Sequence, residues 1–258
     1  MCLLRQLLGF LLAFTLVACA PGTNPRRAYP AAGEQTPASV NTQLAVEYMK
    51  KGMYEAALEK LNKAIRQDAS YAPAHTTLAV LYERLGEPKK AEKHYRRAYR
   101  LDPANPGMLN NYGRMLCQQG KYAEADKMFN KALEDSLYRS PEKALTNAGL
   151  CAARADDLAK AETYFRAALE HNPQYPPALR EMVRVSVRRK HWLAARAFLQ
   201  RLQAVSSLGP EFLLLGVQIE RQLGSREGER EYAGRLKNRY PDSEETASLL
   251  QREHGEDE

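Results

Sequence analysis

The chain has 258 residues, of which 44% are hydrophobic and 27% are charged, and its formal net charge at pH 7 is +7. This composition is typical of an ordinary soluble protein and excludes both a largely disordered chain and a membrane-embedded helical bundle. The positive charge does not predict nucleic-acid binding, because the basic residues are interleaved with acids and are not massed with aromatic side chains.

Residues 1–18 are predicted to be a secretory signal peptide, with Arg5 near the start and an apolar run too short to span a bilayer, which needs about 20 residues. The letters LVAC that end at Cys19 resemble the bacterial lipobox, in which the cysteine thiol carries a diacylglyceryl group. Ordinary cleavage after Ala20 is the alternative, since small residues also stand at the required positions there. We expect lipidation of Cys19, and Ala20 after it implies, by resemblance to bacterial lipoproteins, sorting to the outer membrane.

Residues 19–37 contain four prolines and two glycines with almost no apolar periodicity. The sequence therefore predicts a lipidated cysteine followed by a disordered tether, whose reach as a coil is on the order of 25 Å.

A repeat begins after this tether. Gly52, Gly86 and Gly120 are each 34 residues apart. Two sets of alanines keep the same interval, namely Ala57, Ala91 and Ala125, and Ala64, Ala98 and Ala132. Small and aromatic residues at this period are the signature of the tetratricopeptide repeat (TPR), a helix-turn-helix unit that buries its apolar face only when a neighbour stacks on it.

We predict an all-α fold, a right-handed α-solenoid of about six TPR units over residues 38–243. The predicted repeats are 38–71, 72–105, 106–139, 142–175, 176–209 and 210–243. Two extra residues, Ser140 and Pro141, are expected to lengthen one turn between repeats. Residues 244–252 are predicted to form a capping helix, and residues 253–258 an acidic, frayed tail.

Two later repeats depart from the pattern. Asp156 and Asp157 occupy the place of the turn glycine in the fourth repeat. In the sixth repeat, Gly228 and Glu229 stand where small apolar residues belong, which weakens the helical pattern of its second helix.

Four phrases stand out within the repeats: LNNYGRMLCQQGKYAEA, LTNAGLCAARADDLAKAETYFRAAL, PEFLLLGVQIERQLG and RYPDSEE, of which the first two are more specific than a general TPR consensus. With the lipobox and the tether, they resemble the type IV pilus biogenesis and stability family of TPR lipoproteins over about Asn41 to Glu245. The resemblance implies an outer-membrane pilotin that helps the pilus secretin to reach the outer membrane and to assemble into its ring. Two alternatives stay open, a general envelope assembly lipoprotein for β-barrel insertion or cell-wall enzyme regulation, and a hydrolase-associated subunit.

No catalytic motif is present. The five histidines are scattered, and no metal-binding His-x-x-x-His pair, nucleophile elbow or phosphate-binding glycine loop occurs. We therefore expect no enzyme activity, cofactor, metal or small-molecule substrate. Cys117 and Cys151 are expected near the ends of neighbouring first helices, either as small buried hydrophobic side chains or as a disulfide, for which adjacent TPR helices rarely offer the required Cα distance of about 5.5 Å.

The first helix of each TPR lines the concave surface, where we expect a protein partner to bind. Basic side chains recur on these helices and predict a trough for acidic groups, although they could equally form a solvated face. An apolar seam around Val46, Met49 and Val80 is the competing site. The candidates for the trough are Lys50, Arg84, Arg114, Arg154, Arg180, Arg184 and Arg188, with Asn111 and Asn147 as amide donors and acceptors.

Overall fold

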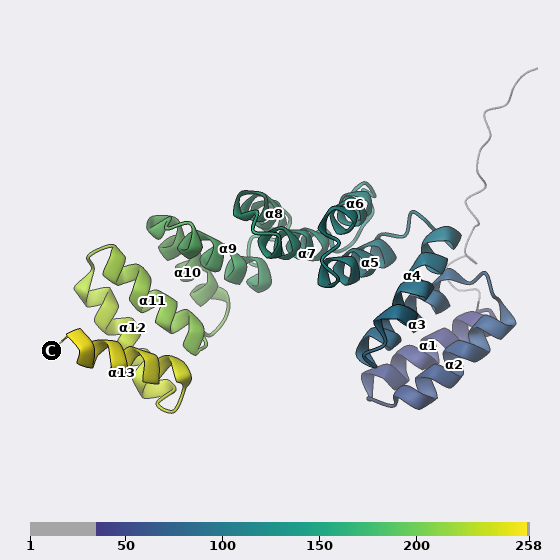
Figure 1. Cartoon of the computed structure of the whole chain (residues 1–258), viewed down its shortest axis with the longest axis horizontal. Coiled ribbons are helices and arrows are strands. Elements are labelled where there is room, and N and C mark those ends of the chain that lie inside the picture. The colour runs from purple at the N-terminus through teal and green to yellow at the C-terminus, as the bar shows by residue number, and fades with distance from the viewer. Residues whose placement is uncertain (1–34, 257–258) are drawn as a thin grey trace, which may run out of the picture. The chain divides into compact units, whose positions relative to one another are not determined.

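The computed structural model describes residues 35–256, and these form thirteen α-helices and no strand (Figure 1). The predicted signal peptide, Cys19 and nearly all of the predicted tether lie outside the described residues. The compact unit begins at Pro37, which is the first residue of α1 and was assigned to the tether by the sequence pattern. None of the helices within the described range is long and apolar enough to cross a bilayer.

Twelve helices form six successive pairs, and a thirteenth follows them. Their bounds are α1 (Pro37–Lys50), α2 (Tyr54–Gln67), α3 (Ala72–Arg84), α4 (Pro88–Leu101), α5 (Pro106–Gln118), α6 (Tyr122–Leu133), α7 (Pro141–Arg154), α8 (Leu158–His171), α9 (Pro176–Arg188), α10 (Trp192–Val205), α11 (Pro210–Gln222), α12 (Arg226–Arg239) and α13 (Glu244–Glu256). All six pairs open with a helix that has proline in its first turn, where the missing N–H costs nothing because no partner is available for it.

The helices stack as an α-solenoid of TPR units. The two helices of a pair pack along each other, the second helix of a pair contacts the first helix of the next, and first helices also touch across pairs, as α5 and α7 do. The second helices present a small, a large and another small side chain to the core, as Ala161, Phe165 and Ala168 do with no exposed surface. This pattern lets two helices interdigitate at short distance.

Glycine on the first helix makes room for the aromatic ring. A Cβ atom at Gly149 would lie 2.4 Å from Phe165, and one at Gly113 would lie 2.9 Å from Phe129, both closer than carbon atoms can approach. These two glycines therefore allow close helix packing in the third and fourth repeats.

The turn inside each pair needs one residue with positive φ. Glycine fills that position in four repeats, with φ between +71° and +75°. In the fourth and fifth repeats Asp156 and Lys190 adopt φ of +62° and +58° instead. This left-handed conformation costs a residue with a Cβ about 1 kcal/mol. The neighbouring Asp157 offsets part of that cost, because its carboxylate caps α8 by accepting a hydrogen bond from the Lys160 N–H at 2.9 Å.

The last repeat forms a full helix pair in spite of its weak pattern. Gly228 leaves space for the side chain of Glu220, since a Cβ there would lie 2.8 Å from the Glu220 carboxylate. Glu220 is 6% exposed, and Arg196 of α10 donates to it at 2.8 Å. An ion pair with a buried carboxylate thus takes the place of the expected small apolar contact. Beyond it, α13 extends to residue 256, past the predicted end of the capping helix, and packs against α11 and α12.

Two histidines meet between α3 and α4. The Nδ1 atoms of His75 and His94 are 3.1 Å apart, and the rings stack with 5.3 Å between their centroids. A hydrogen bond between two Nδ1 atoms needs at least one neutral ring as acceptor. Burial lowers the pKa of both side chains, and for His94, which also faces His75 and Lys93, to about 4. Both rings are therefore held in the neutral form near pH 7.

A disulfide joins Cys117 of α5 to Cys151 of α7, with the Cα atoms 5.7 Å apart. The sequence left this pairing open. The two cysteines do not occupy equivalent positions, because Gly149 follows Gly113 by 36 residues and the counterpart of Cys117 is Ala153. Cys151 therefore lies half a helical turn earlier, and the direct contact between α5 and α7 brings the two sulfur atoms together.

Replacing Gly149 by Ala should lower the free energy of unfolding by about 1 to 3 kcal/mol, because the new methyl group overlaps the Phe165 ring. Chemical denaturation with urea measures this. Gly234→Ala in α12 is the matched control, since nothing lies within 4 Å of its added Cβ and the change should be neutral or stabilising. Equal stability of the two variants would contradict the packing described here.

Replacing Cys117 and Cys151 together by Ala should lower the free energy of unfolding by about 3 to 4 kcal/mol, because the cross-link closes a loop of 34 residues in the unfolded chain. Thermal melts with and without dithiothreitol test the origin of the effect. The reductant should lower the melting temperature of the wild type to that of the variant and leave the melting temperature of the variant unchanged. If the reductant does not change the melting temperature of the wild type, the disulfide does not contribute to stability.

Candidate functional site

The candidate site is the surface formed by the first helices of the pairs, α1, α3, α5, α7, α9 and α11, which we call the A-helix face. Every predicted binding residue lies on one of these helices. Lys50, Arg84, Arg154 and Arg188 are the last residues of α1, α3, α7 and α9. A cation at that position interacts favourably with the negative end of the helix dipole, so part of the recurrence of basic residues has a structural cause.

The basic residues of the second and third repeats contact groups of the protein itself. Arg84 donates a hydrogen bond to the main-chain carbonyl of Met49 at 3.1 Å. Arg114 forms an ion pair with Glu83 at 2.9 Å, and the Tyr95 hydroxyl donates to the same carboxylate oxygen at 2.6 Å. Burial and the Glu83 charge raise the pKa of Tyr95, which stays protonated as a donor.

The fifth repeat has the most extensive ion-pair network of this face. The Arg184 guanidinium binds both carboxylate oxygens of Glu211 at 2.7 Å and also contacts Glu181. It lies over the ring of Phe212, 5.0 Å from the ring centroid. The hydrogen bonds from Arg184 lower the pKa of Glu211, whereas burial raises the pKa of Glu181. Bidentate geometry of this kind fixes the two helices in one register.

Two further predicted residues also bridge repeats. Arg188 pairs with Asp156 of the preceding turn at 2.9 Å. The side-chain amide of Asn147 donates to Asn110 at 2.9 Å, so the inter-repeat partner is Asn110 and not its neighbour Asn111, which is half-buried. The face predicted as a basic trough therefore carries a series of charge pairs and amide contacts between successive repeats.

A smaller set of the predicted residues is free to meet a partner. Within the described residues, Arg154 and Arg180 form no hydrogen bond or ion pair, and the Arg180 charge acts on Glu181 and Glu211 from a distance. Lys50 pairs only with the exposed Glu47, at 2.7 Å. Of the apolar candidates, Val46 and Val80 are half-buried at equivalent positions of α1 and α3, which contact each other, and Met49 is 6% exposed.

The sequence reading missed the acidic partners on this face. Glu83, Glu181 and Glu211 also lie on first helices of the pairs, but only Glu181 shares a helix with its arginine, Arg184. Aligning the acidic and basic positions of successive repeats would have pointed to them. No group of three His, Cys, Asp or Glu side chains within residues 35–256 could hold a metal ion. This face can therefore bind a protein segment through apolar contacts and a few unpaired cations.

Comparison with known proteins agrees with this architecture. Models described as "Tetratricopeptide repeat" match residues 42–106, 106–174 and 152–209. The type IV pilus assembly protein PilF of Pseudomonas aeruginosa is 31% identical over 239 residues, which cover 93% of this chain and 95% of the relative.

Two solved structures are similar over most of the unit. The crystal structure of PilW, described as a widely conserved type IV pilus biogenesis factor, aligns with a TM-score of 0.77 and 32% identity over 84% of this chain and all of that chain. The structure of Pseudomonas aeruginosa PilF aligns with a TM-score of 0.75 and 30% identity over 84% of this chain and 97% of that chain. The chain therefore belongs to the family of TPR proteins that includes PilF and PilW.

Proposed function

We propose that this protein is a lipid-anchored scaffold of type IV pilus biogenesis and acts as the pilotin of the pilus secretin. The observation that carries the proposal is the match to PilF along nearly the whole of both chains, at 31% identity. Cys19 provides the anchor in this proposal, and the protein then works at the periplasmic face of the outer membrane. The stacked repeats supply a surface on which the secretin segment is held during delivery and assembly.

The A-helix face is the proposed binding surface, with the apolar seam at its centre. Val46 and Val80 occupy the same position on two touching helices and keep part of their surface exposed. Three of the six arginines of the trough, Arg114, Arg184 and Arg188, already have acidic partners, which a ligand would have to displace at a cost. In the proposed arrangement the seam supplies affinity, and the unpaired Arg154 and Arg180 increase the rate of encounter with an acidic partner.

Val46→Asp should weaken binding to the periplasmic part of the secretin at least tenfold, about 1.4 kcal/mol, because a carboxylate is then buried in the apolar contact. Arg154→Glu combined with Arg180→Glu should slow association at low salt and change the affinity little at high salt. Biolayer interferometry at two ionic strengths measures both effects, and circular dichroism checks that the variants fold. Leu193→Asp on α10, 71% exposed and outside the A-helix face, is the matched control.

If the double arginine variant loses binding while Val46→Asp retains it, the basic trough and not the seam holds the partner. The function itself is tested in cells that lack the protein. Loss of twitching motility and of secretin multimers, with β-barrel proteins assembled normally, agrees with the pilotin role. A general defect in barrel assembly would support the envelope assembly alternative.

Replacing Cys19 by Ser should prevent lipidation, so that the protein appears as an unprocessed precursor or in the soluble periplasmic fraction. Membrane fractionation with metabolic labelling by a clickable palmitate analogue measures both outcomes. Ala20→Ser is the control, because it keeps the thiol and should leave the protein labelled. A Cys19→Ser protein that is processed normally and stays in the outer membrane would refute the anchor.

A further inference from the structure

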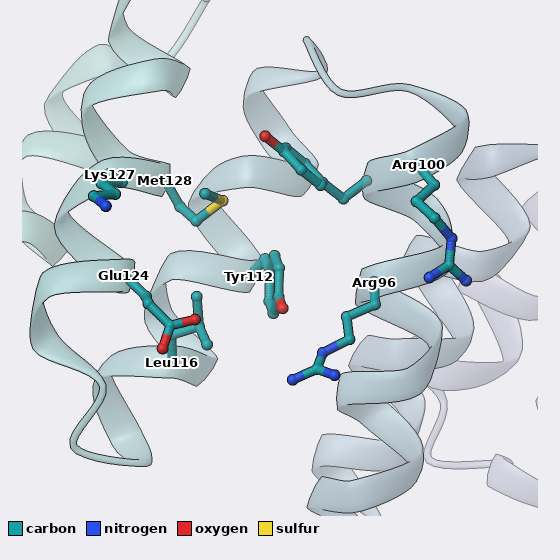
Figure 2. A pocket seen from close by; sticks show the side chains of 8 residues that line it. Arg96, Arg100, Tyr112, Leu116, Glu124, Lys127 and Met128 are labelled. Atoms are coloured by element: carbon teal, nitrogen blue, oxygen red, sulfur yellow. The ribbon is translucent and has the colours of Figure 1, made fainter.

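A hollow of about 360 Å³ lies between α4 and the pair formed by α5 and α6 (Figure 2). None of the predicted binding residues of the A-helix face lines it. Its apolar walls come from Tyr99, Tyr112, Leu116 and Met128. Tyr112 is 7% exposed and Leu116 is 1% exposed, so the floor of the hollow is fixed by the core. The volume lies in the range of ligand-sized pockets, about 300 to 1,000 Å³.

Cations surround this apolar floor. Figure 2 shows Arg96 and Arg100 on one side of the hollow and Lys127 beside Met128 on the other. A second hollow of about 240 Å³ continues along α4 and shares both arginines. It is lined by Lys89, Glu92, Lys93, Arg96 and Arg100. The two hollows together have five cations and only two carboxylates, so the potential there is positive.

Most of these cations have no partner. Lys89, Lys93, Arg100 and Lys127 form no hydrogen bond or ion pair within the part of the chain that the structure describes. Arg96 differs, since it pairs with Glu92 at 2.5 Å, and the Tyr112 hydroxyl together with Glu92 raises the pKa of its guanidinium. The A-helix face presents the opposite situation, because arginines such as Arg114, Arg184 and Arg188 are neutralised by carboxylates of the protein.

We propose that this hollow binds an acidic peptide segment that carries one large apolar side chain. The apolar side chain enters between Tyr112 and Met128. The carboxylates that flank it in the peptide accept charge-assisted hydrogen bonds from Arg100 and Lys127. A membrane surface suits the site less well, because the apolar area is a recess between helices that also has the Glu124 carboxylate in its lining. The same carboxylate can accept a hydrogen bond from the peptide backbone. This site is independent of the function proposed above.

A fluorescein-labelled peptide, GSEDFEDSG, tests the proposal by fluorescence anisotropy with the full-length protein. Binding should be saturable, and it should weaken as the salt concentration rises from about 50 to about 500 mM. Two further peptides separate the contribution of the apolar side chain from that of the carboxylates. GSEDAEDSG lacks the apolar side chain and GSQNFQNSG lacks the charges, and each should bind about tenfold more weakly or worse.

Arg100→Glu combined with Lys127→Glu should reduce affinity for GSEDFEDSG about tenfold or more, because like charges then face the peptide. Met128→Asp should do the same by placing a charge on the apolar wall. The matched control is Lys63→Glu combined with Arg66→Glu on α2, two exposed cations with the same change in net charge, and it should bind like the wild type.

Three outcomes would overturn the proposal. The first is no saturable binding of GSEDFEDSG up to about 1 mM, a Kd that corresponds to about −4 kcal/mol. The second is equal weakening in the hollow variant and in the α2 control, which would mean that binding follows net charge alone. The third is binding of phosphatidylglycerol vesicles that is lost in the Arg100→Glu, Lys127→Glu protein while the peptide fails to bind, which would make the hollow a lipid headgroup site.

Discussion

The fold depends on one packing contact that is repeated along the chain, in which a large side chain of the second helix enters a space left by a small residue on the first. Phe165 against Gly149 is the tightest instance, and Phe129 against Gly113 repeats it. A pair of helices that meets in this way still has an exposed apolar surface, which the next pair covers. The position of each binding residue therefore follows from the register of this contact, because it fixes which side of the first helix is left for a partner.

Much of this arrangement could be predicted from the sequence. The interval of 34 residues identifies the helix pairs, since small and aromatic residues must recur wherever the same contact is made. The sixth repeat was harder, because its second helix depends on Gly228 making room for a buried Glu220 and Arg196 pair, and no periodic pattern reveals such a partner. The sequence also left the disulfide open as one of two alternatives, since the pairing depends on the half-turn offset between Cys117 and Cys151.

The candidate site was predicted less completely than the fold. The sequence located the basic residues on the first helices, but it did not reveal that Glu83, Glu211 and Asp156 neutralise Arg114, Arg184 and Arg188. These pairs join residues about 30 positions apart, so only the stacking of repeats brings them together. The positive charges therefore have different roles on the A-helix face and along α4. On the A-helix face Arg114, Arg184 and Arg188 connect the repeats, whereas, within residues 35–256, Lys89, Lys93 and Arg100 of α4 stay unpaired around an apolar hollow.

The disulfide between α5 and α7 also determines how the array responds to a pulling force. Contacts in a stacked repeat protein are made between neighbours only, so under tension such an array lengthens by losing repeats one after another. Cys117 and Cys151 connect the third repeat covalently to the fourth, at the middle of the six. The bond transmits the force directly from α5 to α7, so the segment between the two cysteines, which includes all of α6, carries no tension and cannot be extended while the rest of the array is stretched.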